Sequence, residues 1–160
     1  MFGLTSLGIF HTLISLVAVA AGAIALIRDG KITWDNTLGK VYLWCTLIVC
    51  LTGFGIFQHG GFGKPHALGV ITLVALGVIY AAREKKLGAK SAYIETVGNS
   101  LTFFFHIVPG VTETATRLPL DAPLAASPED AGIQKVIGIC FLLFLIGAVL
   151  QVRKMNRQGA

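Results

Sequence analysis

Five long apolar stretches alternate with short polar segments along the chain, and each is long enough to form a helix that crosses a bilayer. A membrane-spanning helix needs roughly 20 predominantly apolar residues. We place the spans at about residues 4–27, 38–58, 65–82, 91–116 and 133–152. The pattern therefore predicts an all-α integral membrane bundle of five transmembrane helices, forming a single membrane domain over residues 1–160.

Local signals at the ends of these stretches support the helix assignment. Gly30 can adopt the left-handed conformation that ends a helix, and Pro65 suits the first turn of the third span. Ser127 precedes Pro128 and two acidic residues, a combination typical of a helix start. Aromatic residues beside lysines, among them Tyr42, indicate the level of the lipid headgroups.

The fourth span carries a polar stripe through an otherwise apolar helix. The stripe consists of Glu95, Asn99, Thr102, His106 and Glu113. At about 100° per residue, these positions stay on one side of a helix. Because lipid cannot satisfy polar groups, we expect the stripe to face the bundle interior and the neighbouring Phe104 to face lipid or another subunit.

Composition agrees with a membrane protein. Hydrophobic residues make up 54% of the 160 residues and charged residues only 13%, whereas a soluble domain has roughly a quarter charged residues. The net charge of +5 could suggest nucleic acid as a partner. However, the basic residues lie in short connections between apolar stretches, which is the pattern of membrane orientation, so we exclude nucleic acid.

The distribution of Lys and Arg predicts the orientation. Ten of the 13 basic residues fall on one side of a five-span topology: Arg28, Lys31, Lys40, Arg83, Lys85, Lys86, Lys90, Arg153, Lys154 and Arg157. The other side has three, Lys64, Arg117 and Lys135. Cytoplasmic connections carry the excess of positive charge. The N-terminus is therefore predicted to lie outside and the C-terminus in the cytoplasm.

This topology brings the histidines to the outer half of the bilayer. His11 lies in the outer part of the first span and His106 in the outer half of the fourth, while His59 and His66 flank the outer link between the second and third spans. Glu113 joins them at the outer end of the fourth span. Ionisable residues within a membrane are costly and are associated with function.

The main functional hypothesis is cofactor binding. We expect His11, His66 and His106 to converge and to bind haem b or a transition metal ion, for electron transfer or another metal-site role, because neutral imidazoles ligate both. A zinc-type site formed by these three histidines and Glu113 is compatible with the same residue types. No catalytic residue is assigned. The sequence does not decide whether His59 takes part.

Other interpretations remain open. The stripe could line a polar path in a transporter or proton-relay component, which with only five spans would need a homo-oligomer. It could also bind another protein, as an accessory subunit of a larger membrane complex without a cofactor. His11 and His106 could act as polar contacts between helices, and His59 and His66 as solvated loop residues. Cys45, Cys50 and Cys140 all lie in apolar stretches and are interpreted as reduced thiols, with no disulfide framework.

Three segments carry a resemblance to known proteins: HTLISLVAVAAGAIALIRDGK, LGKVYLW and FGKPHALGVITLVAL. They resemble a family of small bacterial multi-span membrane proteins of unknown function, over about residues 10–80 and more loosely along the fourth span. Some members have a further histidine where this chain has Trp34. The resemblance implies a bacterial inner (cytoplasmic) membrane location and draws attention to His11, His66 and His106.

Overall fold

The computed structural model describes residues 5–57 and 61–159, and within them the chain is helical with no β-strand. Five α-helices follow one another, with a short 3-10 turn, η1, at Gly88–Lys90. The α-helices are α1 (Ser6–Asp29), α2 (Thr37–Gly53), α3 (Lys64–Arg83), α4 (Ser91–Arg117) and α5 (Ala131–Gln158). The predicted all-α class is confirmed.

Several helix ends follow the sequence signals. Gly30 has a φ of 72° and its N–H bonds to the carbonyl of Leu26, so it ends α1 in the left-handed conformation that glycine adopts without strain. Pro65 lies in the first turn of α3, as predicted. Asn36 caps α2, its side chain accepting a hydrogen bond from the Gly39 N–H.

Other ends differ from the prediction. The second helix ends at Gly53 rather than near residue 58, because a turn begins at Phe54. The fifth helix is capped by Asp130, whose side chain accepts from the Gly132 N–H at 2.7 Å, rather than by Ser127. This helix also continues through the basic tail to Gln158 and ends at Gly159, which has a φ of 72°.

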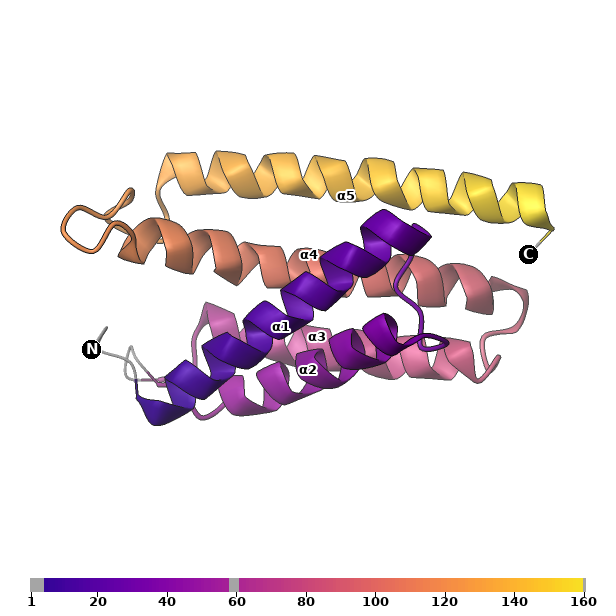
Figure 1. Ribbon diagram of the computed structural model, residues 1–160, viewed down its shortest axis with the longest axis horizontal. Coiled ribbons are helices and arrows are strands. Elements are labelled where there is room, and N and C mark those ends of the chain that lie inside the picture. Colours follow the sequence, from indigo (N-terminus) through magenta and orange to yellow (C-terminus); the bar gives the residue numbers. More distant parts are fainter. Residues whose placement is uncertain (1–4, 58–60, 160) are drawn as a thin grey trace.

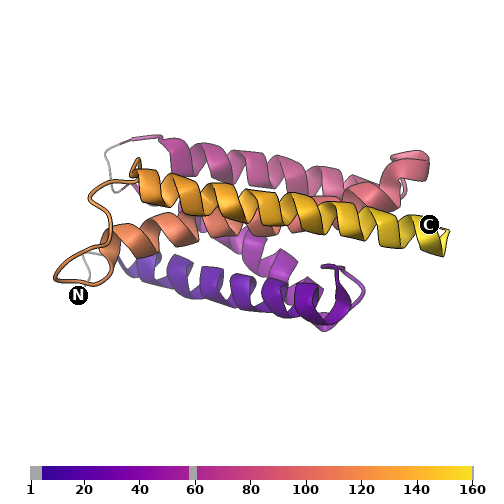
Figure 2. The ribbon, with the colours of Figure 1, turned by 90° about the horizontal axis from the view of Figure 1, so that it is seen from above.

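The helices pack as an up-and-down bundle (Figure 1). The closest pairs are α1 with α2, α3 with α4, and α4 with α5. The beginning of α1 and the end of α5 lie at opposite ends of the bundle (Figure 1). Seen from above, α5 runs along the bundle rather than across it (Figure 2). Since α5 packs mainly on α4, it forms the edge of the bundle.

Three of the helices, α1, α3 and α5, are long and apolar enough to cross a membrane. The apolar helix α2 is shorter, at 17 residues, and the polar stripe makes the 27-residue α4 less apolar. Most large apolar side chains on α5 are exposed, which would be unfavourable in water but is favourable in lipid. The protein is therefore a membrane-associated helical bundle; five spans and their orientation stay predictions.

The core lies where small residues of α1 meet α2 and α4. Buried side chains form one cluster of Ala18, Ala21, Ala25, Ile32, Tyr42 and Leu43. A Cβ atom on Gly22 would lie 2.7 Å from Phe103 and 2.8 Å from Tyr42, so only glycine allows both rings to approach α1. Tyr42 is fully buried within this core. Small residues at such contacts are the usual means of close helix packing in membranes.

Candidate functional site

The polar stripe of α4 is divided between the interior and the surface. Asn99, Thr102 and His106 are 1%, 0% and 6% exposed. Glu95 is half-buried, and Glu113 is exposed and forms an ion pair with Arg117 one turn later. The buried part of the stripe thus faces α1 and α2. Phe104 packs on α5, with ring centroids 5.4 Å from Phe141 and 6.0 Å from Phe144, rather than toward lipid.

Several threonines donate their hydroxyl proton to a backbone carbonyl of their own helix, and three of them also contact a histidine or tyrosine of another helix. Thr46 donates to the carbonyl of Tyr42 at 2.8 Å, and Thr102 to that of Asn99 at 2.9 Å. Thr52 donates to the carbonyl of Ile48 at 2.8 Å. A hydroxyl has one proton and two lone pairs. Each of these oxygens is therefore an acceptor for any further hydrogen bond.

Each hydroxyl has a further partner on another helix. Thr46 Oγ1 lies 2.9 Å from Nε2 of His106, and Thr52 Oγ1 lies 2.9 Å from Nδ1 of His11. Since the threonines accept, His106 carries its proton on Nε2 and His11 carries its proton on Nδ1. In neutral imidazole the opposite nitrogen keeps a lone pair. Nδ1 of His106 and Nε2 of His11 are consequently the basic positions.

Donors and acceptors in the rest of the α2–α4 contact can be assigned in the same way. The hydroxyl of Tyr42 lies 2.8 Å from Thr102 Oγ1 and donates to it. Asn99 donates from Nδ2 to the carbonyl of Ile32 at 3.1 Å, which fixes the α1–α2 connection against α4. The ring of Tyr42 also contacts the edge of His106, with centroids 5.9 Å apart. The hydrogen bonds therefore hold α4 to both α2 and the connection before it.

His11 of α1 and His106 of α4 are each hydrogen-bonded to a threonine of α2, and we refer to the two together as the histidine pair. They come from different helices, yet they lie close enough for their charges to interact. Glu113 is close enough to interact with His11 in the same way. Gly53 lies beside the His11 ring, since a Cβ atom on it would be 3.4 Å from that ring. The site thus lies where α1, α2 and α4 meet.

His66 has a separate environment. Its ring stacks with those of Phe54, Phe57 and Phe62, at centroid distances of 6.5, 5.1 and 5.2 Å. Nδ1 accepts a hydrogen bond from the Gly63 N–H at 3.2 Å, which satisfies the first turn of α3. Its other ring nitrogen, Nε2, is buried and has no hydrogen-bond partner among the described residues. His59 lies outside the described residues.

No group of three His, Cys, Asp or Glu side chains that could hold a metal ion occurs within residues 5–57 and 61–159. The three cysteines are free thiols. No family model, curated protein or solved structure matches the chain. The residues themselves therefore have to carry any assignment of function.

Sequence reasoning missed the partners of the stripe on α2. Tyr42, Thr46 and Cys50 follow at steps of four and are buried on one face of that helix. This spacing was visible in the sequence, and it is the signal that would have paired α2 with α4. The sequence does not predict which hydroxyl contacts which imidazole, because that depends on how far one helix is displaced along its axis relative to the other.

Proposed function

We propose that this small membrane protein binds a haem or a transition metal ion through the neutral imidazoles of His11 and His106. The observation that carries this proposal is the orientation of both rings by threonine hydroxyls. Metal ligation requires an imidazole nitrogen without a proton. Imidazoles that ligate metals usually donate their other N–H to an oxygen, as His11 and His106 do toward Thr52 and Thr46.

The number of side chains available as ligands favours one kind of cofactor. Nδ1 of His66 accepts from the Gly63 N–H, so the neutral ring carries its proton on Nε2 and has no free lone pair for a metal. Glu113 pairs with Arg117, so the proposal includes neither residue as a ligand. Two histidines would be enough to ligate a haem, whereas a structural zinc site takes four ligands. The proposal therefore favours haem. Such a group would supply electron transfer, and the threonines would keep the two rings in the ligating tautomer.

The topology belongs to the same proposal. We assign α2 and α4 as spans alongside α1, α3 and α5, in the bacterial inner membrane with the N-terminus outside. The supporting observation is that the α1–α2 and α3–α4 connections and the end of α5 lie at one end of the bundle (Figure 1). Those are the segments that hold the basic residues. Excess positive charge marks the cytoplasmic side.

An absorption spectrum of the detergent-purified protein, followed by elemental analysis, tests the cofactor. We expect a Soret band in the wild type and its loss in His11→Ala and in His106→Ala. His66→Ala is the matched control, since it removes a buried histidine outside the pair and should keep the band. Absence of both a Soret band and a stoichiometric metal would overturn the proposal, as would equal loss of the band in all three variants.

A proton relay is the second candidate, and the position of Glu113 favours it. Its carboxylate is exposed and within electrostatic reach of His11, which in turn reaches His106. A basic nitrogen on each ring could accept a proton arriving from that carboxylate. Proton flux into liposomes tests this role. We would then expect flux in the wild type and none in Glu113→Gln or His106→Ala, with His66→Ala unchanged.

A further inference from the structure

A groove runs along the inner side of α5, between that helix, α4 and the end of α1. It has a volume of about 540 Å³. Its lining is mainly apolar and aromatic, including Phe103 and Phe104 of α4 and Leu143, Phe144 and Gly147 of α5. We call it the α5 groove. It arises because α5 packs on α4 but hardly touches α1.

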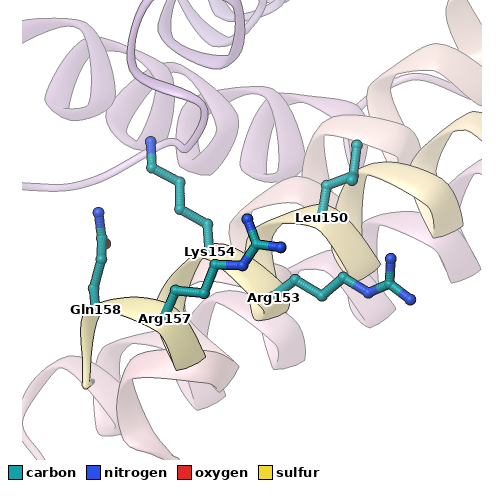
Figure 3. A pocket seen from close by; sticks show the side chains of 5 residues that line it. All are labelled: Leu150, Arg153, Lys154, Arg157 and Gln158. Carbon is teal, nitrogen blue, oxygen red and sulfur yellow. The ribbon is translucent and has the colours of Figure 1, made fainter.

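The groove ends in a basic cluster. Leu150 and Lys154 line both the groove and a second hollow, of about 340 Å³, that is completed by Arg153, Arg157 and Gln158. Figure 3 shows these side chains on the last turns of α5, with Lys154 directed toward the helices at the start of the chain. Arg153, Lys154 and Arg157 are exposed, and none forms an ion pair with another residue in the described part of the chain.

Polar groups line the groove where its apolar part meets its basic part. Gln151 donates to the carbonyl of Gly30 at 2.8 Å and accepts from the Ser100 hydroxyl at 3.0 Å. These two bonds connect α5 to both α1 and α4 just before Lys154. The groove is thus bounded by fixed contacts at the level where its lining changes from apolar to charged.

The dimensions fit one lipid chain. From Cys140 to Lys154 the groove follows α5 over 14 residue steps, about 21 Å at 1.5 Å per step. One leaflet contributes roughly half of the 30 Å hydrocarbon thickness, and the headgroup lies beyond it. An acyl chain along the apolar part would therefore bring its phosphate to the basic cluster.

We infer that the α5 groove binds one anionic phospholipid, with an acyl chain against Phe103, Phe144 and Gly147 and its phosphate on Arg153, Lys154 and Arg157. Charge complementarity selects this occupant: three unpaired cations lie at the headgroup end, and basic pockets between membrane helices bind anionic headgroups. A second copy of the chain would bring a second set of the same cations to this end and would repel the first.

Native mass spectrometry of the purified protein with added lipid tests the inference. We expect one phosphatidylglycerol to bind more tightly than phosphatidylcholine with identical acyl chains. The triple variant Arg153→Gln, Lys154→Gln, Arg157→Gln should weaken phosphatidylglycerol binding by roughly a hundredfold, at about tenfold or less per charge. The control Lys85→Gln, Lys86→Gln, Lys90→Gln removes the same charge from the α3–α4 connection and should leave binding unchanged.

A second variant separates the groove from simple charge attraction. Gly147→Leu places a side chain in the groove where a Cβ meets nothing within 4 Å, so the protein should fold while the acyl chain is excluded. Gly138→Leu is the matched control, since Gly138 also lies on α5 in open space but does not line the groove. We expect loss of the bound phospholipid in Gly147→Leu alone.

Four outcomes would overturn the inference. Equal binding of phosphatidylglycerol and phosphatidylcholine would remove the role of the cations. Displacement of the lipid by excess inorganic phosphate, or an unchanged signal in Gly147→Leu, would show a phosphate site without an acyl chain. A dimer in which Cys140 of one copy cross-links to Cys140 of the other would show that the groove is filled by protein instead.

Discussion

Thr46 of α2 accepts a hydrogen bond from Nε2 of His106 on α4, at 2.9 Å, while its own proton is bonded to the carbonyl of Tyr42. One hydroxyl thus fixes the tautomer of a buried imidazole and joins two helices. The bond lies inside the bundle, where Thr46 is 0% and His106 6% exposed. Water cannot replace it there, so its loss should be measurable.

Thr46→Val keeps the volume and removes the acceptor. We expect a loss of about 1–2 kcal/mol in the free energy of unfolding, because the imidazole N–H is left buried without a partner. The ¹⁵N NMR signals of His106 should also lose the signature of a proton held on Nε2. Thr12→Val is the control, since Thr12 is exposed and bonds only to the carbonyl of Gly8 in its own helix. Equal losses in both variants would contradict the assignment.

Gly22 should tolerate no larger residue. Its hypothetical Cβ lies 2.7 Å from the Phe103 ring and 2.8 Å from the Tyr42 ring, so Gly22→Ala must move rings that are packed against each other. We expect a destabilisation of about 1–3 kcal/mol from this overpacking, measured by unfolding in mixed micelles. Gly77→Ala on α3 meets nothing within 4 Å. It should be neutral or stabilising by up to about 1 kcal/mol.

Helical periodicity predicted much of this bundle. The five apolar stretches became five helices, and the buried positions of α4 follow from the spacing of Asn99, Thr102 and His106. Periodicity assigns a residue to a face, however, and says nothing of what lies opposite. Phe104 was expected to face lipid or another subunit because it is apolar and off the stripe. It packs on α5, since in a bundle a helix can have neighbours on more than one side.

The candidate site was harder to predict than the helices. The sequence predicted how deep in the membrane each histidine lies. That predicted depth was the only reason to group His66 with His11 and His106. Two residues at the same depth can still lie on different sides of the bundle. The ring of His66 stacks with Phe57 and Phe62, which lie in the α2–α3 connection, where no helical periodicity predicts side-chain positions. Hydroxyl partners such as Thr52 could not be identified either, because threonine is common in membrane helices and often bonds only to its own backbone.

The exposed ion pair between Lys64 and Glu129 should contribute little to stability. Lys64 donates a hydrogen bond to Glu129 at 3.1 Å and lowers the pKa of that carboxyl below its ordinary value. A lowered pKa stabilises the folded state at higher pH, and this contribution is lost as the pH falls through the pKa of Glu129 in the folded protein. Both side chains are exposed, so the effect on unfolding should be small.

Lys64→Ala should therefore raise the pKa of Glu129 toward its ordinary value, as followed by ¹³C NMR of the carboxyl carbon. Lys135→Ala removes a lysine from the first turns of α5, at the same end of the bundle, and should leave the pKa of Glu129 unchanged. A pKa of Glu129 that moves equally in both variants would mean that the general positive charge of this end, rather than the single contact, is responsible.

Tyr42 and Thr102 offer the sharpest test of the α2–α4 contact. The tyrosine hydroxyl donates to Thr102 Oγ1 at 2.8 Å, and both residues are fully buried. Tyr42→Phe removes the donor and Thr102→Val removes the acceptor, while the shapes of the side chains are nearly kept. Each single variant should lose about 1 kcal/mol of unfolding free energy. If the bond exists as described, the double variant should lose less than the sum, with a coupling of about 0.6–1.7 kcal/mol, the range found for hydrogen bonds between membrane helices. Additive losses would mean that the two residues stabilise the bundle only through packing. The same result would weaken the inference that Thr46 accepts a hydrogen bond from His106, because that inference rests on the same reasoning.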